Sequence, residues 1–84
     1  MIFDFARTRC ILEVLKILSK GKSKYSIMFK STKVSHTTLQ SILKELEGKE
    51  LIIKHNRGHM NVDYEISIKG RKFLGVLIKL NEFL

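Results

Sequence analysis

The sequence predicts one α+β domain, mainly α, in which three helices precede two strands and a last helix. Three observations lead to this fold class. The chain has 84 residues, 44% of them hydrophobic, which suits one hydrophobic core and no more. Apolar residues recur at helical spacing before residue 48 and after residue 68. Between these regions, residues 62–68 alternate apolar and polar side chains, as a half-buried strand does.

The first helix is predicted over residues 8–20 because its apolar residues have the i, i+4, i+7 spacing of a buried face. That face is formed by Ile11, Leu15 and Leu18. Gly21 is expected to end this helix, since glycine readily adopts the conformation found after a helix. Ser23 is expected to cap a short second helix that reaches about Lys30.

Residues 31–34 lack helical periodicity and are expected to form a turn, after which Ser35 caps the third helix. The third helix is expected to end at Gly48. Its predicted inward-facing residues are Leu39, Ile42, Leu43 and Leu46.

The strands begin at about residues 51 and 62, and a polar loop containing Gly58 joins them as a hairpin. Ser67 can then cap a last helix that reaches about residue 82. This order of elements is the winged helix-turn-helix arrangement. We therefore expect a single domain over 1–84, with these parts: an N-terminal arm at 1–6, the helix-turn-helix at 23–47, the wing hairpin at 51–67 and a dimerisation helix at 68–84.

The charge is strongly positive, with 16 lysines and arginines against 8 acidic residues and a net charge of +8. No acid lies between Val14 and Lys44, a stretch that contains the predicted helix-turn-helix. Its lysines are Lys16, Lys20, Lys22, Lys24, Lys30, Lys33 and Lys44. Such a surplus suggests a polyanionic partner, although lysines that only solvate a surface are the simpler alternative.

Other classes of protein are disfavoured by composition. A single cysteine rules out an internal disulfide framework and a cysteine-only zinc site. No apolar stretch approaches the roughly 18 residues of a membrane span, and the N-terminus lacks the features of a secretory signal. We therefore expect no membrane partner and a cytoplasmic, nucleoid-associated protein.

In its motifs the chain resembles the small archaeal winged helix-turn-helix DNA-binding domains, which include regulators from archaeal chromosomes, plasmids and viruses. The resemblance runs from about Cys10 to Leu74. It rests on Ile11-Leu12 with Leu15 and Leu18, on Val34-Ser35-His36-Thr37-Thr38-Leu39, on Leu43 with Leu46 and Leu51-Ile52, and on Tyr64-Glu65-Ile66-Ser67 with Gly70 and Phe73-Leu74. One departure is Glu50, where such sequences usually have glycine, and Gly48 is expected to take over its role at the end of the helix.

The arrangement assigns two kinds of DNA contact. The outward face of the third helix would enter the major groove and read bases, with Gln40 suited to adenine and Lys44 to guanine or phosphate. The base-reading residues are His36, Thr37, Gln40, Ser41 and Lys44. The phosphate and wing contacts are Lys22, Lys24, Lys30, Lys33, Ser35, Lys54, His55, Arg57 and His59. A solvated helix face and a solvated turn remain the simpler alternatives at these two places.

Metal binding, catalysis and cofactors are not expected. His55 and His59 are four residues apart, but Gly58 places them in a predicted loop, where this spacing does not bring two imidazoles onto one helix face. The sequence shows no nucleophile with a base, no glycine-rich phosphate loop and no paired carboxylates, so it predicts neither an enzyme nor a small-molecule ligand. Cys10 is expected to pack at the first helix, and an intermolecular disulfide is the alternative.

The last helix carries more apolar residues than one small domain can cover, which favours a homodimer; a purely internal role is the alternative. The predicted interface is formed by Ile2, Phe3, Phe5, Cys10, Phe73, Leu77, Leu80 and Leu84. The sequence thus favours a homodimeric transcriptional repressor that reads an inverted repeat. The alternatives are an architectural chromatin-type protein with little sequence preference, and a winged-helix module that binds another protein.

Overall fold

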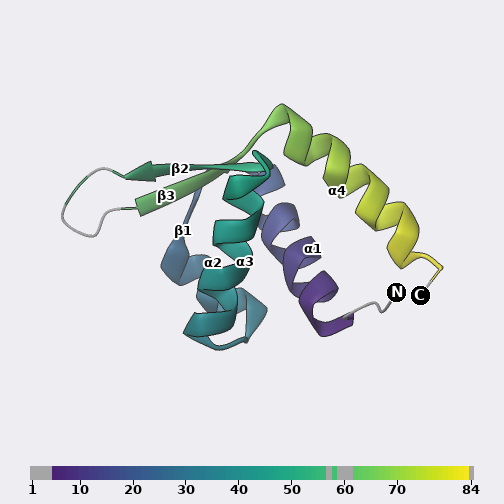
Figure 1. The fold of residues 1–84 in the computed structure, drawn as a ribbon, viewed down its shortest axis with the longest axis horizontal. Coiled ribbons are helices and arrows are strands. Elements are labelled where there is room, and N and C mark those ends of the chain that lie inside the picture. Colours follow the sequence, from purple (N-terminus) through teal and green to yellow (C-terminus); the bar gives the residue numbers. More distant parts are fainter. Residues whose placement is uncertain (1–4, 57, 59–61, 84) are drawn as a thin grey trace.

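The computed structural model describes residues 5–56, 58 and 62–83. The elements follow one another as α1 (Phe5–Ser19), β1 (Ser23–Lys24), α2 (Tyr25–Thr32), α3 (His36–Gly48), β2 (Ile52–Asn56), β3 (Val62–Ile66) and α4 (Ile68–Asn81). Figure 1 shows the β2–β3 wing at one end of the molecule, α4 at the other and the remaining helices between them. The predicted winged-helix order is confirmed, with β1 as an additional strand.

The three strands form one antiparallel sheet in the order β1-β3-β2. Because Ser23 pairs with Tyr64 and Lys24 pairs with Asp63, the prediction that Ser23 caps α2 is wrong. Ser23 is instead a buried strand residue, and Lys24 precedes α2 without a side-chain cap. Pairing with β3 extends the backbone at Ser23, which lies one residue too early to cap the helix.

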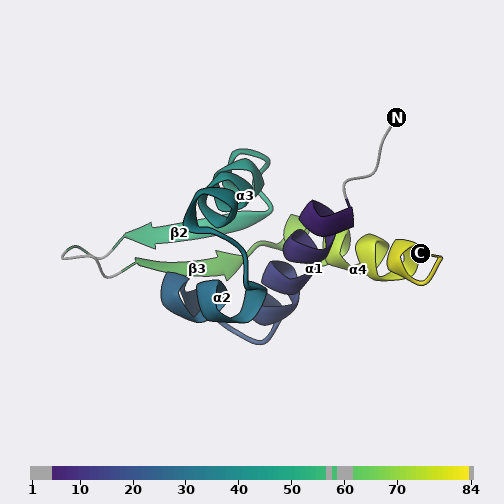
Figure 2. The same cartoon turned by 90° about the horizontal axis from the view of Figure 1, so that it is seen from below.

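The core lies where α1, α2 and α3 meet the sheet and α4. The apolar residues predicted to face inward from α1 and α3 belong to this core or pack against it, so the predicted helical spacing is confirmed. Figure 1 shows α2 and α3 on the same side of the sheet's two long strands, and Figure 2, turned by 90°, shows α3 next to β2 and α2 next to β3. The fully buried side chains are Leu15, Leu18, Met28, Leu39, Ile42, Ile52 and Val14. This packing leaves the opposite face of α3 to solvent.

Helix boundaries differ from the prediction where tertiary contacts extend them. α1 begins at Phe5 rather than near residue 8, and α2 continues to Thr32, so the turn is shorter than expected. The Thr32 hydroxyl donates to the Met28 carbonyl at 2.9 Å, and Lys33 ends α2 in the left-handed conformation with φ of 56°. Ser35 caps α3 as predicted, because its hydroxyl oxygen accepts from the Thr38 N–H at 3.1 Å.

The end of α3 corrects the assignment of Gly48. The helix does end there, but the residue in the left-handed conformation is Glu50, with φ of 62°. The Glu50 N–H donates to the Glu47 carbonyl at 3.0 Å, and the Leu51 N–H donates to the Leu46 carbonyl at 2.9 Å. These two bonds define a Schellman motif, in which glycine normally occupies the position that Glu50 holds here.

α4 is joined closely to the start of the wing. The Ser67 hydroxyl oxygen accepts from the Gly70 N–H at 2.9 Å and so caps α4, as predicted. The same hydroxyl donates to the Glu50 carbonyl at 2.7 Å. Gly70 lies so close to Leu51 and Ile66 that a β-carbon there would overlap both. The start of α4 is therefore fixed against the end of α3, while the rest of the helix packs along α1.

Candidate nucleic-acid interface

The outward face of α3 is open to solvent. Leu39, Ile42, Leu43 and Leu46 are buried as predicted. The proposed base-reading residues His36, Thr37, Gln40, Ser41 and Lys44 are all exposed. α3 therefore presents a continuous polar flank from its first turn onward.

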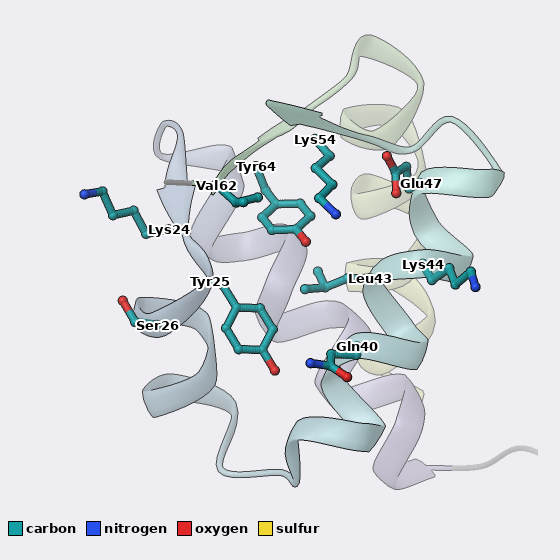
Figure 3. A pocket seen from close by; sticks show the side chains of 10 residues that line it. All are labelled: Lys24, Tyr25, Ser26, Gln40, Leu43, Lys44, Glu47, Lys54, Val62 and Tyr64. Atoms are coloured by element: carbon teal, nitrogen blue, oxygen red, sulfur yellow. The ribbon is translucent and has the colours of Figure 1, made fainter. Parts of the chain in front are cut away.

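A hollow of about 740 Å³ opens beside this flank, between α3, the start of α2 and the base of the wing. Figure 3 shows the Lys54 side chain of β2 pointing into the hollow, while Lys24 of β1 and Lys44 of α3 lie at its rim with their amines pointing outward. The other lining residues are Tyr25, Ser26, Gln40, Leu43, Glu47, Val62 and Tyr64. The structure thus brings together cations from three segments that are separate in the sequence.

Glu47 places an acid beside the proposed base-reading residues. Gln40, Lys44 and Glu47 are spaced by four and three residues, which places them on one side of a helix, and all three line the hollow. Burial raises the pKa of Tyr64, and the Glu47 charge raises it further. One carboxylate therefore stands at the end of the hollow nearest the wing.

Glu45 points elsewhere. Its carboxylate pairs with Arg7 of α1 and, at 3.3 Å, with Lys49. Hydrogen bonds from Arg7 and Lys49 lower the pKa of Glu45. This acid therefore ties α3 to α1 and stays away from the hollow.

His36 is exposed but engaged with α2. Its ring stacks on Phe29 with centroids 3.7 Å apart, and its Nδ1 lies 2.9 Å from the Tyr25 hydroxyl. The Tyr25 ring is also stacked with both, at 5.7 Å from His36 and 6.2 Å from Phe29. These contacts link the two helices of the helix-turn-helix and occupy one edge of the His36 ring.

The lysines around the second helix divide between two sides of the molecule. Lys24 lines the hollow beside α3. Lys22 lines a separate hollow of about 540 Å³ together with Lys16, in the last turn of α1, and Lys20, which follows that helix. Lys22 and Lys24, which are close in the sequence, therefore line different hollows. Lys30, Lys33 and Ser35 are exposed.

The base of the wing is described, whereas Arg57 and His59 lie outside the described residues. Lys54 is exposed. His55 pairs with Glu65 on the neighbouring strand at 2.8 Å, and this hydrogen bond lowers the pKa of Glu65. Gly58 has φ of 83°, and its N–H donates to the Asn56 side chain at 3.0 Å, which fits the predicted use of glycine in the turn.

The residues assigned to a dimer interface fall into three groups. Ile2, Phe3, Leu84 and the side chain of Phe5 lie outside the described part of the chain. Cys10 and Leu77 are buried within the monomer, so its own packing accounts for them. Phe73 and Leu80 are half-buried, whereas Val76 of α4 is 61% exposed and Phe83, which follows the end of α4, is 86% exposed.

Tyr25 and Glu47 line the hollow but are not among the DNA-contacting residues predicted from the sequence. The i, i+4, i+7 spacing of Gln40, Lys44 and Glu47 places Glu47 on the same side of α3 as the first two. No sequence signal brings Tyr25 to α3, because that contact depends on how two helices pack.

Among the described residues, no three histidine, cysteine or acidic side chains lie close enough together to hold a metal ion. None of the described helices is long and apolar enough to cross a membrane.

The helices, the three-stranded sheet and the exposed third helix define a winged helix-turn-helix protein. A family model described as "Winged helix-turn-helix" matches residues 6–84, and the chain belongs to this family. No curated protein matches it.

Solved structures show the same fold. The chain is similar to a transcriptional regulator from Clostridium thermocellum, with a TM-score of 0.85, 21% identity, and 99% of this chain and 89% of that chain covered. It is similar to smu.1704 from Streptococcus mutans, with a TM-score of 0.85, 23% identity, and 99% and 85% covered. It is also similar to the reduced form of the transcriptional regulator YodB from B. subtilis, with a TM-score of 0.71, 18% identity, and 99% and 91% covered.

Proposed function

We propose that this protein is a DNA-binding transcriptional regulator that acts in the cytoplasm on chromosomal DNA and catalyses no reaction. The exposed polar flank of α3 beside a lysine-lined hollow is the observation that carries this proposal. A helix with one buried and one free face suits the major groove, which admits an α-helix. Two of the similar solved structures are transcriptional regulators, which supports the same function.

In this proposal α3 reads base edges and the hollow receives one phosphate backbone. Gln40 pairs with adenine, Lys44 contacts guanine or phosphate, and Lys24 and Lys54 contact phosphates on either side. Lys22 is left out of the proposed contact because it faces the α1–α2 side. Arg57 and His59 at the wing tip extend the contact along the backbone or into the minor groove.

Glu47 makes one end of the hollow unfavourable for a phosphate. Its carboxylate repels phosphate, so the backbone is expected to follow Lys24 and Lys44 rather than the end of α3 nearest Glu47. The start of α3, where Ser35 accepts from the Thr38 N–H, also suits a phosphate, because the helix dipole stabilises an anion there. The proposed contact on α3 therefore runs from its first turn to Lys44 and stops short of Glu47.

We further propose a homodimer whose interface is formed by α4. Phe73, Val76, Leu80 and Phe83 step by three, four and three residues, the spacing of a helix-pair seam. This seam differs from the one predicted from sequence, because the exposed residues Val76 and Phe83 replace Leu77 and Leu84. α4 lies at the end of the molecule away from the wing, so a second copy there would leave both reading surfaces open.

The dimer proposal is tested by sedimentation of two variants that each add one positive charge. Val76→Lys places that charge in the proposed seam and is expected to give a monomer at micromolar concentration. Ile53→Lys places it on the exposed face of the sheet and is expected to leave the dimer intact. A wild-type protein that sediments as a monomer at this concentration contradicts the proposal.

A dimer of this kind would place two α3 helices on inverted half-sites separated by about 34–36 Å, one helical turn of DNA. Repression by blocking polymerase access is its simplest action. Gel shifts with random and selected duplexes across a salt series test the regulator directly. An affinity ratio above about 10³ supports it, because specific sites are bound that much more tightly than other DNA.

The same gel shifts separate the alternatives. A ratio near one supports an architectural protein, which binds through phosphates alone and still shows a steep salt dependence. Absence of binding at moderate salt supports a protein-interaction module. The mixed charge of the hollow, with Glu47 among the lysines, favours selective contact over uniform coating of DNA.

A further inference from the structure

The Tyr25 hydroxyl lies between the two helices of the helix-turn-helix. It is 2.9 Å from Nδ1 of His36, the first residue of α3. On its other side it meets the Gln40 side chain one turn further along α3, and Figure 3 shows the two groups pointing toward one another. One hydroxyl of α2 thus contacts two residues of the proposed reading helix.

The directions of these hydrogen bonds follow from the chemistry of the groups. Burial raises the pKa of Tyr25, and a hydrogen bond with Gln40 opposes that rise. A donor stabilises the phenolate, so the Gln40 amide presents an N–H toward the phenol oxygen, as its nitrogen does in Figure 3. The Tyr25 O–H donates to Nδ1 of His36 in the tautomer that carries its proton on Nε2.

Stacking of their rings with Phe29 stabilises the positions of the Tyr25 and His36 side chains. Phe29 lies 3.7 Å from the His36 ring, centroid to centroid, with only 8° between the ring planes. The Tyr25 ring is within 13° of parallel to His36 and 8° of parallel to Phe29. The hydroxyl that meets Gln40 is therefore part of a stacked unit, whereas an exposed glutamine without a partner samples many rotamers.

We propose that Tyr25 is a specificity-determining residue that positions Gln40 for adenine. One N–H of the Gln40 amide is used by Tyr25, which leaves the other N–H and the carbonyl oxygen for the duplex. Adenine presents N7 as an acceptor and N6 as a donor in the major groove, which matches that pair. Without the Tyr25 contact, the Gln40 amide can rotate and present its donor and acceptor in either order, so it discriminates less between bases. This inference rests on the proposed function.

The test uses full-length protein and duplexes taken from selection on a random pool. The position read by Gln40 is first identified as the one where Gln40→Ala relaxes base preference. Tyr25→Phe, which keeps the stacked ring and removes only the hydroxyl, is expected to lower the adenine preference there about two- to tenfold, the range for one lost hydrogen bond. Preferences elsewhere in the site and the salt slope are expected to stay the same.

Two more variants isolate the mechanism. Thr32→Val removes a hydroxyl from the far end of α2 and is expected to leave the adenine preference unchanged. His36→Phe keeps a ring on Phe29 but removes the acceptor for the Tyr25 O–H, so a smaller loss at the same position is expected. In a Gln40→Ala background, Tyr25→Phe is expected to cause no further change.

The outcomes separate this inference from the function on which it rests. If Gln40→Ala relaxes one position and Tyr25→Phe does not, the positioning role is refuted while the DNA reader stands. If Tyr25→Phe weakens binding to every sequence equally, Tyr25 supports the fold or the phosphate contact and the inference is refuted. If Gln40→Ala relaxes no position, the assignment of α3 as reader fails, and the inference fails with it.

Discussion

Replacing Glu50 by glycine is expected to stabilise the protein. Glu50 adopts φ of 62°, where the β-carbon of an L-residue crowds the following carbonyl oxygen at a cost of about 1–2 kcal/mol. Glycine avoids this cost but loses about 0.5–1 kcal/mol more backbone entropy on folding than a residue with a side chain. The contacts made here through the backbone, the Leu51–Leu46 bond and the Ser67 bond to the Glu50 carbonyl, survive the change.

The net gain is therefore about 0.5–1 kcal/mol in the free energy of unfolding. For a domain of this size that corresponds to a rise of about 2–8 °C in Tm, measured by circular dichroism at neutral pH. Glu50→Ala is the matched control, because it removes the same carboxylate but keeps the β-carbon and so the strain. If Glu50→Ala raises Tm as much as Glu50→Gly, charge rather than backbone conformation is responsible and the reasoning is refuted.

Three further predictions concern packing, DNA contact and pH. Gly70→Ala is expected to destabilise the fold by about 1–3 kcal/mol in urea unfolding, because the new β-carbon overlaps neighbouring backbone; an unchanged midpoint would show that α4 can shift freely. Lys24→Ala is expected to reduce the slope of log K against log salt by about one unit, whereas Lys22→Ala leaves it unchanged; equal effects would contradict the division of the lysines between two sides. Because hydrogen bonds from Arg7 and Lys49 lower the pKa of Glu45, its ionised form stabilises the fold above its unfolded-state pKa and loses that effect as pH falls through the lower folded-state pKa. The stability difference between wild type and Glu45→Gln is therefore expected to be largest at neutral pH and to disappear in strong acid, and a constant difference across this range would contradict the ion pair.

The periodicity of single helices was enough to predict most of the fold. In α3, for example, the four apolar positions recur on one side, so burial of that side follows from helix geometry in any packing arrangement. The same holds for the caps at Ser35 and Ser67, where a hydroxyl beside a helix start satisfies a free N–H a few residues away. These features depend on neighbours in the chain.

The misplaced features depend on distant partners. Ser23 and a cap residue look alike in sequence, and only pairing with Tyr64 makes Ser23 a strand residue. Leu77 was assigned to a dimer seam, but contact with the rest of the core buries its side chain at 8% exposure, because packing decides which side of α4 is covered.

For the candidate site, the sequence by itself determined which side of α3 is polar and that the surrounding stretch is basic, because both are properties of one helix and its neighbours along the chain. Only the tertiary structure decided that Lys24 and Lys54 border that face while Lys22 does not, and that Tyr25 meets His36 and Gln40. The physical reason is that these relations join residues of different elements, whose separation depends on how the helices and sheet pack together.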